Sequence, residues 1–242
     1  MPQFHGMVKE SAAELRALGQ KARDLDIRLS FHPSQFVVLN SPDHELVANS
    51  VWDLASQAEM QDLMDQGPEA VLVIHVGGTY GDIPVSRARW VETWKTLPEP
   101  VRRRLVLEHD DQRFSAADVL RIHEHTGVRL IFNYQHFWCL NPEQLALRQT
   151  LEHVLATWPA GQQLKIHYSS PRTDARTRAR RHENPQEDDA EAFGYRAPGE
   201  PQLAYAAAAR EAFSPRLLTL FAVLRSGRGL FRARSKVTES KV

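Results

Sequence analysis

The stretch RLVLEHDDQRFSAADVLRIHEHTGVRLIFNYQH (104–136) decides the fold that we expect for this chain. It contains two short apolar segments, RLVLE (104–108) and VRLIF (128–132), with a helical pattern between them. The string SAAD (115–118) resembles a capping box, so we expect the helix to begin there and to end near His125. A strand, a helix and a second apolar strand form the repeating unit of a parallel α/β sheet with right-handed crossovers.

The same alternation extends in both directions from this unit. Three further strand-length apolar segments are IRLSF (27–31), VLVIHV (71–76) and LKIHY (164–168). Near-continuous apolar runs are typical of strands that are buried on both faces. Helical patterns separate them, at 9–25, at 43–66, from Ser86 to Trp94 and from Glu143 to Trp158. We therefore predict an α/β fold of the (β/α)8 TIM-barrel type, incomplete, with about five of the eight strand–helix units recognisable.

The chain changes character after Pro171, where apolar periodicity gives way to charge. The segment 172–200 contains RTDARTRARR followed by an acidic run, and Ala-rich helical patterns follow it. We divide the chain into a partial TIM-barrel catalytic domain (1–171), a charged exposed loop (172–200), a helical remainder of the barrel (201–230) and a basic, disordered tail (231–242).

The composition favours a globular protein of the cytoplasm. Of the 242 residues, 42% are hydrophobic and 25% are charged, and 30 Lys+Arg balance 30 Asp+Glu. A zero net charge excludes a strongly basic nucleic-acid binder, so any DNA contact must use a local patch or a bound metal. Cys139 is the only cysteine, which excludes an internal disulfide. No apolar run reaches the roughly 18 residues of a membrane span, and the start MPQFHGMVKE lacks the core of a signal peptide.

Each predicted strand ends at a polar side chain that can bind a metal. In strand order these residues are His32, His75, Glu108, Asn133 with His136, and His167 with Lys165 two residues before it. The carboxyl ends of barrel strands meet at one mouth, so we expect these side chains to converge. One histidine at a strand end is more often structural, but five successive strands favour a metal site. Nitrogen and oxygen ligands suit Zn²⁺, Mn²⁺, Fe²⁺ or Co²⁺, and a sugar isomerase with a similar barrel is an alternative at this point.

Several longer strings surround these residues and narrow the choice. They are HPSQFVVLNSP (32–42), HVGGTYGD (75–82), LEHDD (107–111), FNYQHFWCLNP (132–142) and KIHYSSPR (165–172). From Ala12 to Arg172, their order and spacing resemble the UV damage endonuclease family. The resemblance implies a TIM barrel with a cluster of divalent metals at its mouth and cleavage of the DNA backbone beside a lesion.

The resemblance also implies roles for individual residues of the mouth. Its metal ligands would be His32, His75, Glu108, Asn133, His136 and His167. Glu108 matches a glutamate that bridges metals, and Lys165 matches a lysine that can be carboxylated beside them, so these two are the predicted catalytic residues. The expected metal is Mn²⁺, with Zn²⁺, Mg²⁺ or Co²⁺ as alternatives.

A second group of residues would contact the expected partner, double-stranded DNA that contains UV lesions. Gln35 and Phe36 match a pair that wedges into the duplex and probes the damaged bases. The alternative for Phe36 is a buried aromatic side chain. Tyr80 is expected to line the DNA groove or to pack on its wall, and His109 to contact a phosphate or to support the metal ligands.

The sequence departs from the family pattern at several points. Asn133 stands where the family has Asp, and His109 stands where it has Asn. Two further strands are expected before the helix at 9–25, and a glutamate-bearing last strand is not matched after Leu224. The hypothesis is therefore a metal-dependent DNA repair endonuclease that binds metal weakly and is impaired. The alternatives are a truncated, inactive relative that binds metal or DNA, and a sugar isomerase-like barrel enzyme.

Overall fold

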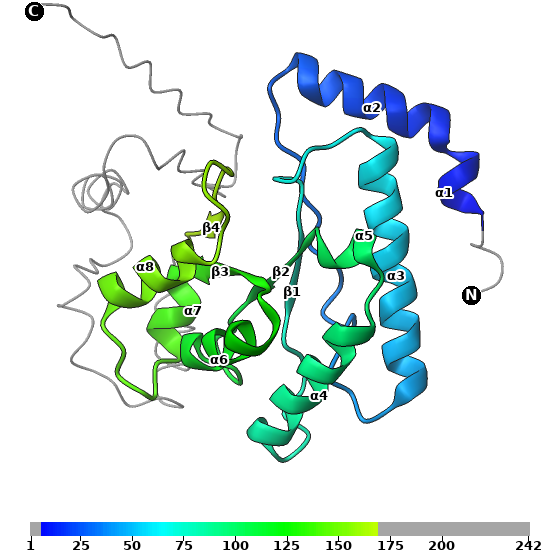
Figure 1. Ribbon diagram of the computed structural model, residues 1–242. Coiled ribbons are helices and arrows are strands. Elements are labelled where there is room, and N and C mark those ends of the chain that lie inside the picture. The colour runs from blue at the N-terminus through cyan, green and yellow to red at the C-terminus, as the bar shows by residue number, and fades with distance from the viewer. Residues whose placement is uncertain (1–5, 169–242) are drawn as a thin grey trace, which may run out of the picture.

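A computed structural model describes residues 6–168 of the chain (Figure 1). In chain order its elements are α1 (Met7–Glu10), α2 (Ala12–Asp24), α3 (His44–Leu63), β1 (Leu72–His75), α4 (Ile83–Thr96), α5 (Glu99–Arg102), β2 (Leu105–Glu108), α6 (Ala116–Thr126), β3 (Arg129–Asn133), α7 (Tyr134–Cys139), α8 (Leu147–Ala156) and β4 (Ile166–His167). The loop, helices and tail predicted for 172–242 lie outside the described residues. Within residues 6–168, no helix is both long and apolar enough to cross a membrane.

The strands form a parallel sheet in the order β1-β2-β3-β4, as the sequence predicts. The predicted strand at 27–31 is shorter than expected, because only Phe31 joins the sheet. Phe31 makes a single parallel bridge with Leu72, in which its N–H donates to the Val71 carbonyl at 3.0 Å and its carbonyl accepts from Val73 at 2.9 Å. The order of all five predicted segments is thus confirmed, and the first of them is reduced to a bridge.

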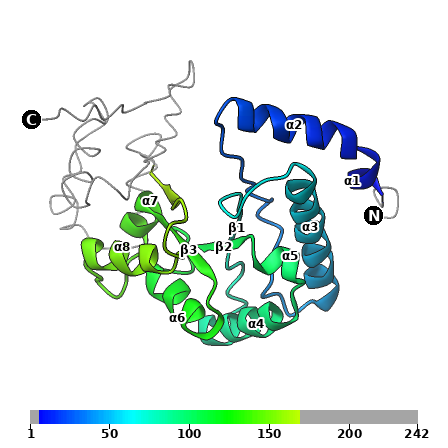
Figure 2. The ribbon, with the colours of Figure 1, turned by 45° about the horizontal axis from the view of Figure 1, so that its top comes forward.

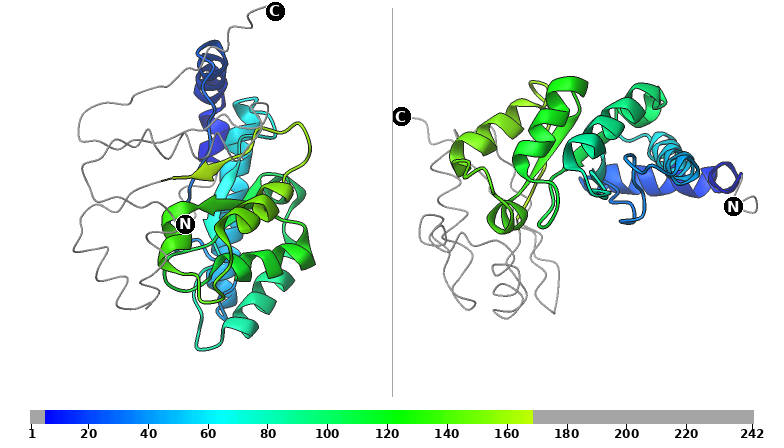
Figure 3. Two further views of the ribbon diagram at one scale, coloured as in Figure 1. Left: turned by 90° about the vertical axis from the view of Figure 1, so that its left-hand side faces the viewer. Right: turned by 90° about the horizontal axis from the view of Figure 1, so that it is seen from below.

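The helices cover one side of this sheet. In Figures 2 and 3, α3, α4, α6 and α8 follow one another round the outside of the strands. Alternate strand residues point toward these helices and form the main core with them: Leu72, Ile74, Leu105, Leu107, Leu130 and Phe132. The residues between them form a smaller cluster on the inner side: Val71, Val73, Val106 and Ile131, with Trp158 and Leu164. This arrangement is a partial (β/α) barrel, with period-two alternation deciding which side chains face the interior.

The helix starts near the carboxyl edge of the sheet are fixed by side-chain caps. Ser115 and Asp118 form the predicted capping box of α6, and Gly127 ends that helix in the left-handed region with φ 70°. Asp82 caps α4 by accepting from the N–H of Val85 at 2.8 Å. Asn133 caps α7, a short helix that the sequence pattern does not predict. The caps fix the course of the chain where it leaves the strands.

Arginine side chains stabilise the amino edge of the sheet, where the strands begin. Arg104 is only 5% exposed and donates to Asp62 Oδ1 at 2.6 and 3.0 Å. It also donates to the carbonyls of Gln66, Gly67 and Ala70, in the loop that enters β1. A buried guanidinium with these partners leaves few donors unsatisfied and ties three backbone carbonyls to one side chain.

We expect Arg104→Met to lower the free energy of unfolding by about 2 kcal/mol or more, since it removes the donors of Asp62 and of three backbone carbonyls, of which that of Ala70 is buried. Urea denaturation measures the change. The matched control is Arg148→Met, which removes an exposed guanidinium that is paired with Glu152 and should cost about 0.5 kcal/mol or less. Equal stability of the two variants would contradict this account of the edge.

Candidate metal centre

The predicted ligands lie on the inner side of the sheet because of the strand alternation. His75, Glu108 and Asn133 each stand two residues after an inward-facing apolar side chain. In the sheet register, His75 is paired with Glu108, and Asn133 is paired with His167. His32 directly follows the bridge residue Phe31. The carboxyl ends of neighbouring strands therefore bring these side chains to one place.

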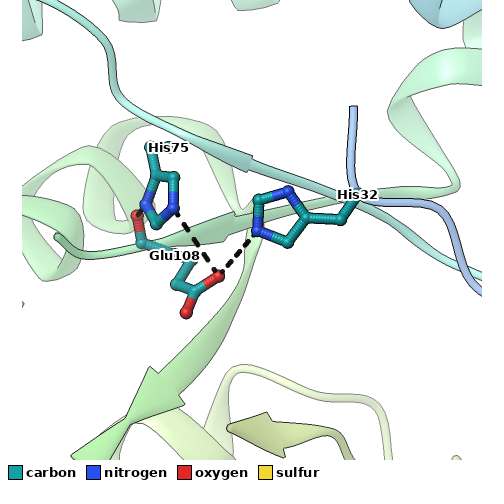
Figure 4. A group of neighbouring side chains, drawn as sticks. All are labelled: His32, His75 and Glu108. Carbon is teal, nitrogen blue, oxygen red and sulfur yellow. Dashed lines mark hydrogen bonds and ion pairs between the residues drawn. The ribbon is translucent and has the colours of Figure 1, made fainter. Parts of the chain in front are cut away.

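Glu108 is the centre of this group, and its side chain is 1% exposed. Its Oε1 accepts hydrogen bonds from Asn133 Nδ2 at 2.7 Å and from His167 Nδ1 at 2.8 Å. Its Oε2 lies 3.3 Å from His32 Nε2 and 4.0 Å from His75 Nε2 (Figure 4). One carboxylate thus meets side chains from four other strand ends.

The electrostatics keep this carboxylate ionised. Burial alone would raise the pKa of Glu108, but the hydrogen bond from His167 and the contact with His32 outweigh burial and hold the pKa well below its usual value. Contact with Glu108 raises the pKa of His32 in turn. Burial lowers the pKa of His75, which favours its neutral ring. The centre therefore offers an anionic oxygen beside a neutral imidazole.

The surroundings of the Glu108 Oε2 atom suit a bound metal ion. Among the described residues it is buried and accepts no hydrogen bond. A buried anionic oxygen without a donor is costly, and a divalent cation would satisfy it. One ligand atom each from His32, His75 and Glu108 lie within 4.8 Å of one another. His75 Nδ1 donates to the Glu108 carbonyl at 3.2 Å, which leaves Nε2 free to bind a metal. These residues could hold a divalent ion.

The remaining predicted ligands lie beside Glu108 but make other contacts. His136 Nδ1 lies 3.6 Å from Glu108 Oε1 and donates to the His109 carbonyl at 2.8 Å. Asn133 Oδ1 accepts from the N–H groups of Gln135 at 3.0 Å and of His136 at 3.2 Å. These two donors fix the amide orientation, so Asn133 meets Glu108 with its N–H and its oxygen serves the cap of α7. Its role as a ligand stays a prediction.

Lys165 stands two residues before His167 and lies on the same inner side of the sheet. Its Nζ donates to Ser30 Oγ at 2.6 Å. Burial, together with the nearby charge of Arg28, lowers the pKa of Lys165 to about 8. Sequence reasoning missed Ser30, although it stands two residues before His32 and so shares the inward direction. The catalytic role of Lys165 stays a prediction.

The predicted DNA-contact residues fall into two groups. Gln35 and Phe36 form the tip of a turn in which the Val37 N–H donates to the Ser34 carbonyl at 2.9 Å, and Phe36 is 73% exposed. The alternative of a buried Phe36 is therefore wrong. Tyr80 is also exposed, on the loop after β1.

His109 requires a correction, because it is fully buried and cannot reach a phosphate. Its Nε2 accepts from the Asn133 N–H at 3.1 Å, so its side chain joins the end of β2 to the end of β3. The alternative role, support of the metal ligands, stays a prediction.

Comparison with known proteins decides the family. The family model of UV-endonuclease UvdE matches residues 3–193. The chain belongs to this family. A UV DNA damage endonuclease of Bacillus velezensis is 35% identical over 167 residues, which are 69% of this chain and 52% of the relative. One of Clostridium perfringens is 29% identical over 163 residues, 66% of this chain and 40% of the relative. The chain thus spans about half the length of these relatives or less.

Solved structures agree with the partial barrel. The crystal structure of SacUVDE matches with a TM-score of 0.62 and 35% identity, over 68% of this chain and 55% of that one. An Escherichia coli protein, 3-keto-D-glucoside 4-epimerase YcjR, matches with a TM-score of 0.50 over 73% of this chain and 84% of that one. Its identity is 13%, so that likeness concerns the fold alone.

His109 makes the stability of this UvdE-family chain depend on pH. Burial lowers its pKa to about 3, whereas an unfolded histidine titrates near about 6.5. Between these values the unfolded chain binds a proton that native His109 does not, so this residue destabilises the native state as pH falls. From pH 7 to 5, its contribution is about 2 kcal/mol.

The free energy of unfolding should fall for both the wild type and His109→Gln when the pH is lowered from 7 to 5. We expect the fall to be about 2 kcal/mol smaller for His109→Gln than for the wild type. Glutamine keeps an acceptor for the Asn133 N–H but carries no proton. Urea unfolding in EDTA at both pH values measures the difference, and His153→Gln on α8, where the side chain is exposed, is the matched control. A His109→Gln profile parallel to that of the wild type would contradict the neutral buried ring.

Proposed function

We propose that this chain acts as a metal-dependent DNA repair endonuclease that hydrolyses the DNA backbone beside UV photoproducts in the cytoplasm. Its family and the names of its relatives support the activity and the DNA substrate. The observation that carries the proposal is the buried Glu108 Oε2, which faces two imidazole nitrogens and accepts no hydrogen bond within the described residues. We expect Mn²⁺ as the metal.

In this proposal the residues of the centre divide between holding and orienting. His32, His75 and Glu108 hold the metal through the atoms that already face one another. Asn133 and His167 orient Glu108 by donating to its other oxygen, so that Oε2 stays turned toward the two histidines. A divalent ion bound there would supply an activated water and neutralise charge on the phosphodiester.

Selection of damage would fall to the exposed turn that carries Gln35 and Phe36. Phe36 projects into solvent close in sequence to His32, at the same edge of the sheet. A side chain in that position can wedge into a duplex at the cost of unstacking bases. A lesion lowers this cost, because its stacking and pairing are already disturbed.

A second candidate is a relative that binds metal or irradiated DNA without cutting it. One observation favours it: Asn133 presents an N–H group to Glu108, so the centre has one carboxylate where an Asp would give two. The sugar isomerase-like alternative rests on likeness of fold alone.

Nicking of irradiated plasmid tests the proposal. With Mn²⁺ the wild type should nick irradiated plasmid faster than untreated plasmid, and EDTA should abolish nicking. Glu108→Gln should lower the rate by about 100-fold or more, since it removes an anionic ligand, whereas His153→Gln should not change it. Binding of irradiated DNA without nicking would favour the second candidate, and equal nicking of both plasmids would contradict the damage specificity.

Asn133→Asp should have opposite effects on the metal-free and the metal-loaded protein. In EDTA, a second carboxylate beside Glu108 Oε1 should lower the free energy of unfolding by about 1–3 kcal/mol through like-charge repulsion. With Mn²⁺, the same carboxylate should strengthen metal binding, so the rise in melting temperature on adding metal should exceed that of the wild type. Thermal unfolding with and without Mn²⁺ measures both effects, and an equal rise in the two proteins would count against the site.

A further inference from the structure

Tyr80 has a backbone conformation that is unusual for its residue type. Its φ is 48°, in the left-handed region that aromatic side chains rarely adopt. The conformation belongs to a tight turn, in which the Asp82 N–H donates to the Thr79 carbonyl at 2.9 Å. Glycine would fit this position without strain, yet the chain places there a large ring that is 45% exposed. Part of the ring packs against Gly78, where an added Cβ would lie 2.9 Å from its Cε2 and Cζ atoms, and the exposed remainder is available for a contact outside the fold.

Arg89 of α4 covers one face of this ring. Its guanidinium carbon lies 5.3 Å from the ring centre of Tyr80. Arg89 Nε donates to the Asn40 carbonyl and Nη2 donates to Ser86 Oγ, both at 2.9 Å. The guanidinium is therefore fixed from two sides, and it fixes the ring in turn.

The loop that carries Tyr80 is joined to the loop that carries Phe36. Asn40 Nδ2 donates to the Gly78 carbonyl at 2.8 Å. The two loops also approach closely, since a Cβ atom on Gly77 would lie 2.3 Å from Asn40 Oδ1. Tyr80 and Phe36 thus project from two connected loops at the carboxyl edge of the sheet.

The two exposed aromatic rings are suited to different contacts. A ring that inserts between bases needs both of its faces, and Phe36, 73% exposed at a turn tip, can offer them. One face of Tyr80 is already covered by Arg89, so Tyr80 can pack against a sugar or a base edge but cannot insert. This difference separates a contact that adds affinity from one that reads damage.

We infer that Tyr80 is a preformed DNA-contact residue, held by Arg89 as a positioning residue, and that it raises the affinity for duplex DNA whether or not the duplex is damaged. The inference rests on the proposed function, because it assumes a DNA substrate at this edge. It assigns damage recognition to the Phe36 turn and general duplex binding to the Tyr80 loop.

Fluorescence anisotropy with irradiated and untreated duplexes in EDTA tests the role of Tyr80. Tyr80→Gly should weaken binding of both duplexes by about tenfold, as expected when an aromatic contact residue of an interface is truncated, and leave their affinity ratio unchanged. Its melting temperature should stay equal or rise, because glycine relieves the strain. Tyr80→Asn, which also tolerates this backbone, should behave alike. The matched control is Gln144→Gly, an exposed residue with φ 52°, which should keep full binding.

Salt dependence tests the positioning role of Arg89. Arg89→Met should weaken binding of both duplexes, while the slope of log affinity against log salt should match that of the wild type. A direct contact between Arg89 and a phosphate would instead lower the slope by about 1. That result would overturn the positioning role.

The outcomes separate this inference from the proposed function. Absence of duplex binding by the wild-type chain would contradict the DNA substrate itself. The inference fails if the wild type binds DNA and Tyr80→Gly binds it equally well, whether or not the melting temperature of the variant falls. The ring would then have a structural role only. A loss confined to the irradiated duplex would show that Tyr80 reads damage and would also overturn it.

Discussion

The centre of this molecule depends on one buried, ionised carboxylate. Glu108 is 1% exposed, and a charge so removed from water is tolerated only with donors or cations around it. The donors come from Asn133 and His167, and the imidazoles of His32 and His75 face the remaining oxygen. Each partner sits at the end of a different strand segment, so the parallel sheet is the frame that satisfies this one charge.

The amino and carboxyl edges of the sheet, where the strands begin and end, carry different kinds of side chains. At the amino edge, Arg104 ties the entering loop through Asp62 and backbone carbonyls, and Arg129 stacks on Trp158 at 5.0 Å. At the carboxyl edge, polar ligands and exposed aromatic residues gather. In (β/α) barrels the first of these edges usually serves stability and the second carries the chemistry, and this chain, which spans about half the length of its relatives, has the same distribution of residue types.

The strands, the main helices and the convergence of the predicted ligands could be predicted from the sequence, because each depends on a periodic or local pattern of residues. Strand alternation puts His75 and Glu108 on the inner side, and SAAD (115–118) specifies a helix start through a local hydrogen-bond pattern. The shortening of 27–31 to a bridge at Phe31 could not be read from apolar content, because pairing depends on a partner strand. The phosphate contact expected of His109 is excluded by its burial, which follows from packing against β3 and leaves no signal in the local sequence. The orientation of the Asn133 amide could not be predicted from the sequence either, because it depends on α7, a helix too short to leave a periodic pattern.

The most direct test of a metal site at Glu108 is to locate Mn²⁺ in crystals of the chain by anomalous scattering. We expect a metal about 2 Å from Glu108 Oε2 and from the Nε2 atoms of His32 and His75. A metal bound elsewhere, with Glu108 still held only by its protein neighbours, would contradict it.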